Sequence, residues 1–221
     1  MTLALFDHDH TLIPFDSGLA WTRFLVRAEV LAGDAEARYL AFCHHYVAGT
    51  LDIHAMHRAS MAPLAGFTPA QLRQWQHDFG REIAPQLPAS MLDLVAGHRA
   101  RGDLCALVTA TSRLVAEPLA RAFHLEHLLC TEAVLTNGVP SGEIAGLPCY
   151  GEHKVTRVQA WLAARAGPER AWADFEAIWF YSDSVSDVAL LQAVSHPVAV
   201  RPDARLRSHA LAAGWPILDA L

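Results

Sequence analysis

The chain has 221 residues, of which 52% are hydrophobic, and its 23 acidic and 17 basic residues give a formal net charge of −6. A chain this long and this apolar is expected to fold into one domain, or one domain with a sizeable insertion, and not to be disordered. The negative charge, the lack of any apolar run near about 20 residues and the four scattered cysteines exclude a general nucleic-acid binder, a membrane span and a disulfide scaffold, so we expect a cytoplasmic protein.

The first predicted strand covers residues 3–6 and ends at two acids, Asp7 and Asp9, which Thr11 follows. Burying two neighbouring carboxylates is costly unless a cation balances them, and Mg²⁺ prefers oxygen ligands of this kind. Two acids at the carboxyl end of a strand suit a carboxylate nucleophile and a second acid for proton transfer. A strand that runs into an acidic turn would show the same sequence pattern, so the assignment of Asp7 and Asp9 as catalytic acids depends on the rest of the chain.

The stretch from about residue 17 to residue 85 shows helical periodicity throughout. Three apolar series keep the spacing of one helix face, and segments that contain glycine separate them. The series cover residues 21–28, 39–47 and 72–83. Thr68 and Pro69 are typical of the N-cap and the first residue of a helix. We therefore predict a small helical bundle inserted between the first strand and the next.

Strands and helices alternate through the remainder of the chain. Strands are predicted at 104–108, 128–130, 178–181, 197–200 and 216–218, and helices at about 88–101, from Thr111 onward, and at 152–166, 186–193 and 203–213. Asn137 and Gly138 indicate a hairpin between residues 132–135 and 139–144. Pro118 is expected to kink the helix that contains it. This alternation predicts an α/β fold, a doubly wound parallel sheet with helices on both faces.

Polar residues stand at the ends of three predicted strands. They are Asp7 and Asp9, Thr109, and Asp183 and Asp187. Because the carboxyl ends of parallel strands share one edge of a sheet, four acids should meet in one crevice, where a metal would hold them. Lys154, which opens a predicted helix, adds a cation for a phosphate. A nucleophile, a metal, a lysine and a hydroxyl donor are the groups that phosphoryl transfer requires.

In this order the motifs resemble those of the haloacid dehalogenase superfamily, in its phosphoserine phosphatase-like branch. The matching residues are Asp7-His8-Asp9-His10-Thr11, Val108-Thr109, Lys154 and Asp183 through Asp187. The resemblance covers nearly the whole chain. It implies a Rossmann-like core formed by residues 1–15 and 86–221, with a helical-bundle cap inserted at residues 16–85.

The resemblance also implies a role for each residue. Asp7 would attack phosphorus and form an aspartyl phosphate, while Asp9 would protonate the leaving alcohol and then activate water. Thr109 and Lys154 would hold the phosphoryl oxygens. The metal would be Mg²⁺, bound by Asp7, the backbone carbonyl of Asp9 and Asp183, with Asp187 in support. The sequence departs from the family pattern at His8, His10 and Ser182, and we expect His10 to alter the entry side of the site.

Shorter patterns are similar to a bacterial group of this branch that includes histidinol-phosphate phosphatases. They are Asp16-Ser17 with Trp21, Val108 to Thr111 with Arg113, Cys149 before Lys154, Tyr181 to Ser184, and Gly214-Trp215-Pro216. The expected substrate is a small phosphorylated metabolite, histidinol phosphate first and phosphoserine or another metabolite second. Asp16 suits the amine of either compound. Phosphoserine also needs a cation for its carboxylate, for which Arg23 and Arg58 are candidates, although a solvated helix face accounts for either of them equally simply. Arg113 is a further candidate for contact with the substrate.

Three further possibilities remain at this stage. The phosphoryl group could pass to another alcohol instead of water. The chain could be a binding protein that keeps the fold without catalysis, although such a protein would often lack Asp7 or Asp9. Histidine pairs such as His54 and His57 could hold a structural zinc, but no cysteine–histidine ligand pattern accompanies them. Dehalogenase chemistry is disfavoured because it needs no Mg²⁺, whereas acids for a metal site are present.

Overall fold

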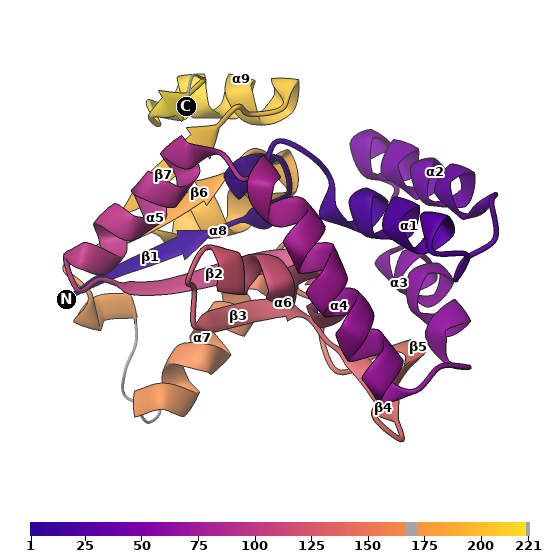
Figure 1. Ribbon diagram of the computed structural model, residues 1–221. Helices are drawn as coiled ribbons and strands as arrows, with labels where there is room; N and C mark the ends of the chain where they lie inside the picture. Colours follow the sequence, from indigo (N-terminus) through magenta and orange to yellow (C-terminus); the bar gives the residue numbers. More distant parts are fainter. Residues whose placement is uncertain (167–171, 220–221) are drawn as a thin grey trace.

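The computed structural model describes residues 1–166 and 172–219 as an α/β fold built on a six-stranded sheet (Figure 1). All neighbouring strands of the sheet are parallel, in the order β3-β2-β1-β6-β7-β8. The strands are β1 (Thr2–Phe6), β2 (Leu104–Ser112), β3 (His127–Thr131), β6 (Ala177–Ser182), β7 (His196–Val200) and β8 (Ile217–Leu218). The doubly wound parallel sheet predicted from the sequence is confirmed.

The helices fall into two groups along the chain. Those inserted between β1 and β2 are α1 (Ser17–Arg27), α2 (Ala35–Ala48), α3 (Ile53–Met61), α4 (Pro69–Ile83) and α5 (Ala89–Ala100). Those that follow β2 are α6 (Arg113–Ala122), α7 (His153–Ala166), α8 (Val188–Ala193) and α9 (Ala204–Ala213). In the part of the chain that the structure describes, none of these helices has the length and apolar character needed to cross a membrane.

The central strand β1 supplies side chains to two hydrophobic cores. Ala4 and Phe6 belong to one buried cluster, whereas Leu3 and Leu5 belong to the other. Successive side chains of a strand point to opposite faces, so a continuous apolar run fits a strand that is covered on both sides. The first cluster includes residues of α4, α5 and α6, and the second includes residues of α7, α8 and α9.

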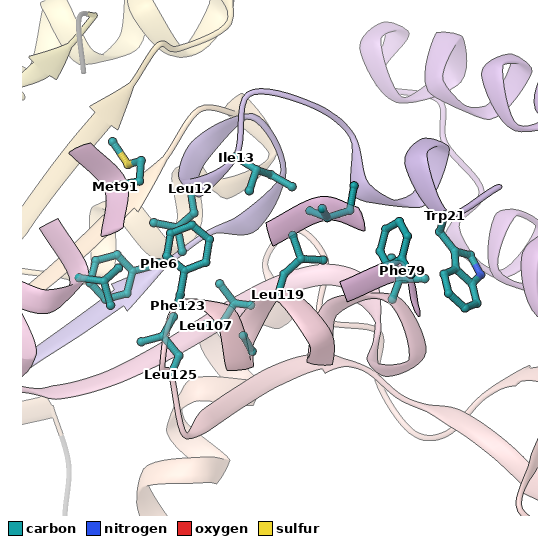
Figure 2. Close-up of a cluster of buried hydrophobic side chains, with 14 of the residues drawn as sticks. Phe6, Leu12, Ile13, Trp21, Phe79, Met91, Leu107, Leu119, Phe123 and Leu125 are labelled. Atoms are coloured by element: carbon teal, nitrogen blue, oxygen red, sulfur yellow. The ribbon is translucent and has the colours of Figure 1, made fainter. Parts of the chain in front are cut away.

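The first core extends without a break into the inserted helices. Figure 2 shows it running from Phe6 through Leu119 to Phe79 and Trp21. The rings of Trp21 and Phe79 meet edge to face, with their centroids 5.2 Å apart. In Figure 1, α1, α2 and α3 lie beyond the carboxyl end of β1. The division into a core of residues 1–15 and 86–221 and a cap of residues 16–85 stays a prediction.

The predicted hairpin is present, and it packs against the inserted helices. Strands β4 (Ala133–Thr136) and β5 (Val139–Ile144) pair antiparallel, and the turn residues Asn137 and Gly138 both have positive φ angles, 53° and 80°. Such angles favour Asn-Gly in a two-residue hairpin. Glu143 of β5 forms an ion pair with Arg58 of α3 at 2.9 Å, which ties the hairpin to the helices.

The helix predicted from Thr111 begins two residues later, at Arg113. Strand β2 continues through Thr109, Thr111 and Ser112, and Ser112 pairs with Thr131 across an irregularity in the ladder. The β-branched threonines favour this extended backbone. The extension carries both threonines to the end of the strand, where they reach the acids that follow β1.

Pro118 lies inside α6, and a side chain from another helix compensates for it. A proline at this position cannot bond to the carbonyl four residues earlier, which is that of Leu114. The Gln76 side chain of α4 donates a hydrogen bond to this Leu114 carbonyl at 2.8 Å. The conflict between Pro118 and a helix is therefore relieved by a contact between α4 and α6.

We expect Gln76→Ala to lower the free energy of unfolding by about 1–3 kcal/mol, because the partly buried Leu114 carbonyl loses its partner. Urea denaturation measures this change. Gln74→Ala is the matched control, since the Gln74 side chain bonds only to the exposed Asp78 carboxylate, and it should change stability by less than about 0.5 kcal/mol. Equal losses in the two variants would contradict this account of α6.

Candidate active site

Six of the residues that the sequence singles out line one cavity of about 850 Å³, and they are Asp7, Asp9, Asp16, Thr109, Lys154 and Asp183. Asp7 and Asp9 reach it from the end of β1, Thr109 from β2, and Asp183 from the end of β6, while Lys154 of α7 closes the same end. The inserted helices α1, α2 and α3 line much of the remaining wall, together with Tyr150, residues 184–186 and residues 203–205. Parallel topology places these strand ends together, as predicted.

Lys154 holds two buried carboxylates at the bottom of the cavity. Its Nζ donates to Asp7 Oδ1 and to Asp187 Oδ2, each at 2.7 Å. Lys154 is only 2% exposed, and it is the only lysine in the chain. Burial works against its charge, but Asp187 and Asp7 outweigh burial and hold its pKa well above the usual value. Asp187 Oδ2 also accepts a hydrogen bond from Ser182 Oγ at 2.8 Å, while Asp187 Oδ1 is buried and has no partner among the described residues.

Asp7 and Asp183 carry raised pKa values because their charges are buried near other carboxylates. Burial raises the pKa of Asp7 to about 7, and Asp187 and Asp9 add to the effect while Lys154 opposes it. Burial and the charge of Asp7 raise the pKa of Asp183 to about 8. Thr11 donates its hydroxyl to Asp183 at 3.0 Å, and among the described residues no cationic side chain pairs with Asp183.

Asp9 is held on both of its carboxylate oxygens. Oδ1 accepts from the backbone amide of Ser17 and Oδ2 from the hydroxyl of Thr111, both at 2.7 Å. Burial works against its ionisation, but the neighbouring His8 and these hydrogen bonds outweigh burial and lower the pKa of Asp9. Asp9 is therefore fixed in position and ionised. Thr109, which is 1% exposed, accepts a bond from the Thr111 amide and so shapes the same strand end.

The two histidines around Asp9 have different surroundings. His8 is fully buried, and burial lowers its pKa while the charge of Asp9 opposes that shift. His10 is exposed at the cavity, with a left-handed φ of 57° that residues other than glycine seldom adopt. Arg201 donates to the carbonyls of His10 and Thr11, at 3.1 and 2.6 Å, and thereby holds this turn.

Asp16 lines the cavity from the start of α1. Its Oδ1 accepts from the backbone amide of Leu19 at 2.7 Å and from the hydroxyl of Tyr39 at 2.9 Å. Burial and the charge of Asp9 raise the pKa of Asp16. The sequence prediction placed Asp16 near the substrate, and the structure brings it to the same cavity as Asp7.

The three arginines considered as substrate contacts do not line this cavity. Arg23 bonds to Glu36, Arg58 to Glu143 and Arg113 to Glu132, each through an ion pair of 2.9 Å or shorter. A sequence pattern cannot show that a nearby glutamate will capture an arginine. The structure therefore does not support the expectation that Arg58 and Arg113 contact the substrate.

The roles of several site residues were not predicted from the sequence. Thr111 and the backbone of Ser17 hold Asp9, and Ser182 bonds to Asp187. Thr111 was predicted to start a helix, so its position at the end of strand β2, from which it reaches Asp9, was not expected. As for the histidine pairs, the described residues contain no group of three or more His, Cys, Asp or Glu side chains arranged to hold a metal.

Comparisons with known proteins agree with this geometry. Residues 4–192 match the family of haloacid dehalogenase-like hydrolases. A histidinol-phosphatase of Neisseria meningitidis is 34% identical over 220 residues, which cover 98% of each chain. A phosphoserine phosphatase of Mycobacterium tuberculosis is 31% identical over 228 residues, covering 98% of this chain and 70% of that protein.

A solved structure shares the fold over the full length. The structure of a protein of unknown function from Bordetella pertussis superposes with a TM-score of 0.90 at 43% identity, covering 99% of this chain and 98% of that one. Sequence family, relatives and fold thus agree with the ordered motifs at the strand ends. The chain belongs to the haloacid dehalogenase-like hydrolase family, and it is an enzyme of the phosphatase kind.

Proposed function

We propose that this enzyme hydrolyses a small phosphomonoester through a phosphoryl group carried on Asp7, with Mg²⁺ as cofactor. The observation that carries the proposal is the arrangement around Asp7. Its Oδ1 is fixed by Lys154 at 2.7 Å, while Asp9 and Asp183 line the same cavity from adjacent strands. This arrangement supplies a nucleophile, a second acid and a cation within one enclosed space.

In the first step, the free oxygen of Asp7 attacks phosphorus as the bond to the leaving alcohol breaks. Asp9 gives that alcohol a proton. Lys154 and the hydroxyl of Thr109 hold the phosphoryl oxygens. In the second step, Asp9 takes a proton from water, the water oxygen attacks phosphorus, and the Asp7 carboxylate is released with inorganic phosphate. The balance of the two steps is one ester and one water consumed, and one alcohol and one phosphate formed.

The state of Asp9 fits the second step directly. Its lowered pKa makes it a proton acceptor in the free enzyme. For the first step Asp9 must gain a proton. The negative charge of a bound phosphate would raise the pKa of Asp9, because a nearby like charge favours the protonated form of a carboxylate. The two bonds from Ser17 and Thr111 keep Asp9 in place for both steps.

The donor set fits Mg²⁺. Asp183 lacks a cationic partner among the described residues, and Asp187 Oδ1 is buried without any partner. Asp7, Asp183 and the backbone carbonyl of Asp9 would hold the ion, with Asp187 in support. When bound, Mg²⁺ would neutralise carboxylates and phosphoryl oxygens.

We expect Mg²⁺ to raise the melting temperature of the enzyme, and we expect Asp183→Asn to abolish that rise. A ligand that binds only the folded state stabilises it by about 2.7 kcal/mol at 100 times its dissociation constant. Calorimetry with increasing Mg²⁺ measures the shift, and Asp93→Asn, on an exposed face of α5, is the matched control. A full Mg²⁺ shift in the Asp183 variant would contradict the metal assignment.

For the substrate we propose an amine-bearing phosphomonoester, histidinol phosphate. A relative with 34% identity is named histidinol-phosphatase, and Asp16 offers a carboxylate to an amine inside the cavity. Phosphoserine is the alternative, supported by the relative with that name. The ion pairs of Arg23, Arg58 and Arg113 remove these three arginines as partners for the carboxylate of phosphoserine, whereas Arg205 of α9 lines the cavity.

A substrate panel tests the proposed function. Phosphate release is measured with Mg²⁺ from histidinol phosphate, phosphoserine and several sugar phosphates. Preferential release from histidinol phosphate is expected. Steady-state release of alcohol in excess of phosphate, when a second alcohol is added, would show a phosphotransferase instead. Binding of these esters without release of alcohol or phosphate would show a catalytically silent member of the fold.

A further inference from the structure

The wall of the cavity contains polar atoms that the protein itself leaves unpaired. Among the described residues, five buried side-chain nitrogen or oxygen atoms have no hydrogen-bond partner, and three of them belong to residues that line the cavity. These three are Trp21 Nε1, His57 Nε2 and Ser112 Oγ. Buried polar groups are nearly always satisfied in native proteins, so an unpaired one needs a reason. Their location suggests that a ligand supplies the missing partners.

The three atoms belong to different parts of the cavity. Ser112 directly follows Thr111, whose hydroxyl holds Asp9, so it belongs to the end where the acids meet. Trp21 and His57 stand on the inserted helices α1 and α3, and they are 2% and 6% exposed. Figure 2 shows the indole nitrogen of Trp21 on the ring edge turned away from Phe79. His57 is neutral, because burial lowers its pKa.

The surroundings of Trp21 and His57 define what could bind there. The same helices line the cavity with apolar side chains, which include Leu19, Ile53, Met56 and Met61. An apolar wall that carries one indole donor and one neutral imidazole suits a planar or compact group with its own hydrogen-bonding atoms and no charge. Among the described residues, the arginines of α1 and α3 are paired with glutamates, so a carboxylate would depend on Arg205 of α9, which also lines the cavity.

We propose that His57 and Trp21 form a subsite for the end of the substrate remote from phosphorus, and that this subsite selects a neutral hydrogen-bonding group. The proposal rests on the proposed function, because it assumes that a phosphomonoester enters this cavity with its phosphate toward Asp7. It assigns a specificity role to His57, a residue outside the motifs that carry the chemistry. It also explains why two buried donors or acceptors persist without a partner in the protein.

Two substrates that differ only in the ring test the subsite. Histidinol phosphate and phenylalaninol phosphate share the phosphate and the amine, but the phenyl ring has no nitrogen. We expect kcat/KM to be about 10- to 100-fold higher for histidinol phosphate, because the phenyl ring leaves the subsite atoms unpaired. The generic ester para-nitrophenyl phosphate, which has no amine, reports on the chemistry at Asp7 without this preference.

Variants of His57 decide whether the preference comes from this residue. His57→Phe keeps a ring but removes both nitrogens, and it should reduce the preference to less than about threefold through a higher KM for histidinol phosphate. His57→Gln keeps a polar group near the same position and should restore part of the preference. His54→Phe is the matched control, since His54 lies on the same helix, is exposed and does not line the cavity.

The outcomes separate the subsite from the proposed function. Turnover of histidinol phosphate with an unchanged ring preference in His57→Phe and in Trp21→Phe would overturn the subsite and leave the phosphatase mechanism standing. Loss of para-nitrophenyl phosphate turnover in His57→Phe would show a structural role for His57 and would also overturn it. No turnover of any ester by the unmodified enzyme would overturn the proposed function itself.

Discussion

Asp7→Asn is expected to reduce kcat by at least about 10⁴-fold for every phosphomonoester that the enzyme accepts, because an amide oxygen is a poor nucleophile toward phosphorus. The fold should survive. The amide side chain keeps an oxygen that can accept the bond from Lys154, and Lys154 retains its second partner, Asp187, at 2.7 Å. The substitution also removes one of the crowded carboxylate charges. Steady-state phosphate release and urea unfolding measure the two effects separately.

The result is informative only if both measurements are made on the same preparation. An unfolding free energy within about 1 kcal/mol of the unmodified enzyme, together with the loss of turnover, supports the nucleophile assignment. Asp93→Asn again serves as the control for an exposed acid. Residual turnover of more than about one per cent of the unmodified rate would sink the assignment, because another group would then have to attack phosphorus.

Lys154→Met is expected to be the most destabilising single substitution at the site. Removing one partner of a buried ion pair leaves an uncompensated charge and costs about 3–5 kcal/mol. Here two carboxylates lose their partner, and Asp187 is only 1% exposed. Chemical denaturation without Mg²⁺ measures the loss. Turnover should fall as well, because Lys154 is the cation placed against Asp7.

A double variant shows whether the cost arises from the charge or from packing. Adding Asp187→Asn to Lys154→Met removes one stranded carboxylate, so the double variant should be more stable than Lys154→Met alone. The bond from Ser182 to the residue at position 187 can persist, because an amide oxygen also accepts it. If the stability losses of the single variants Lys154→Met and Asp187→Asn simply add in the double variant, the stranded charge of Asp187 is not the source of the instability.

The alternation of strands and helices was enough to predict the sheet and the meeting of its strand ends. Apolar runs on both faces of β1 specify a buried strand, and parallel topology then brings Asp7, Thr109 and Asp183 together. These are properties of local sequence and connectivity. The α/β fold could therefore be predicted correctly without information on tertiary contacts.

The start of α6 was predicted two residues too early for a physical reason. Thr111 and Ser112 are common N-cap residues, and the sequence alone favours a helix start there. In the structure Thr111 is still on β2, where its hydroxyl bonds to Asp9 from a distance of 102 positions in sequence. Asp9 comes within reach of Thr111 only once strands β1 and β2 pair in the sheet, so local sequence cannot indicate this hydrogen bond.

The ion-pair partners of the arginines also could not be predicted from the sequence. Arg58 meets Glu143 because the β4–β5 hairpin folds against α3, and Arg113 meets Glu132 beside β3. Both pairs are partly or fully exposed, and they depend on tertiary placement. The unpaired nitrogens of Trp21 and His57 are invisible in sequence for the same reason, because lack of a partner is a property of the folded cavity.

The most direct test of the account is to trap the phosphoryl group on the enzyme. The enzyme is mixed with Mg²⁺ and histidinol phosphate, quenched in acid within one turnover and digested, and the peptides are examined by mass spectrometry. The account predicts one phosphorylated peptide with the phosphoryl group on Asp7, and none from Asp7→Asn. Rapid turnover with no phosphorylated peptide, or with the group on another residue, would contradict it.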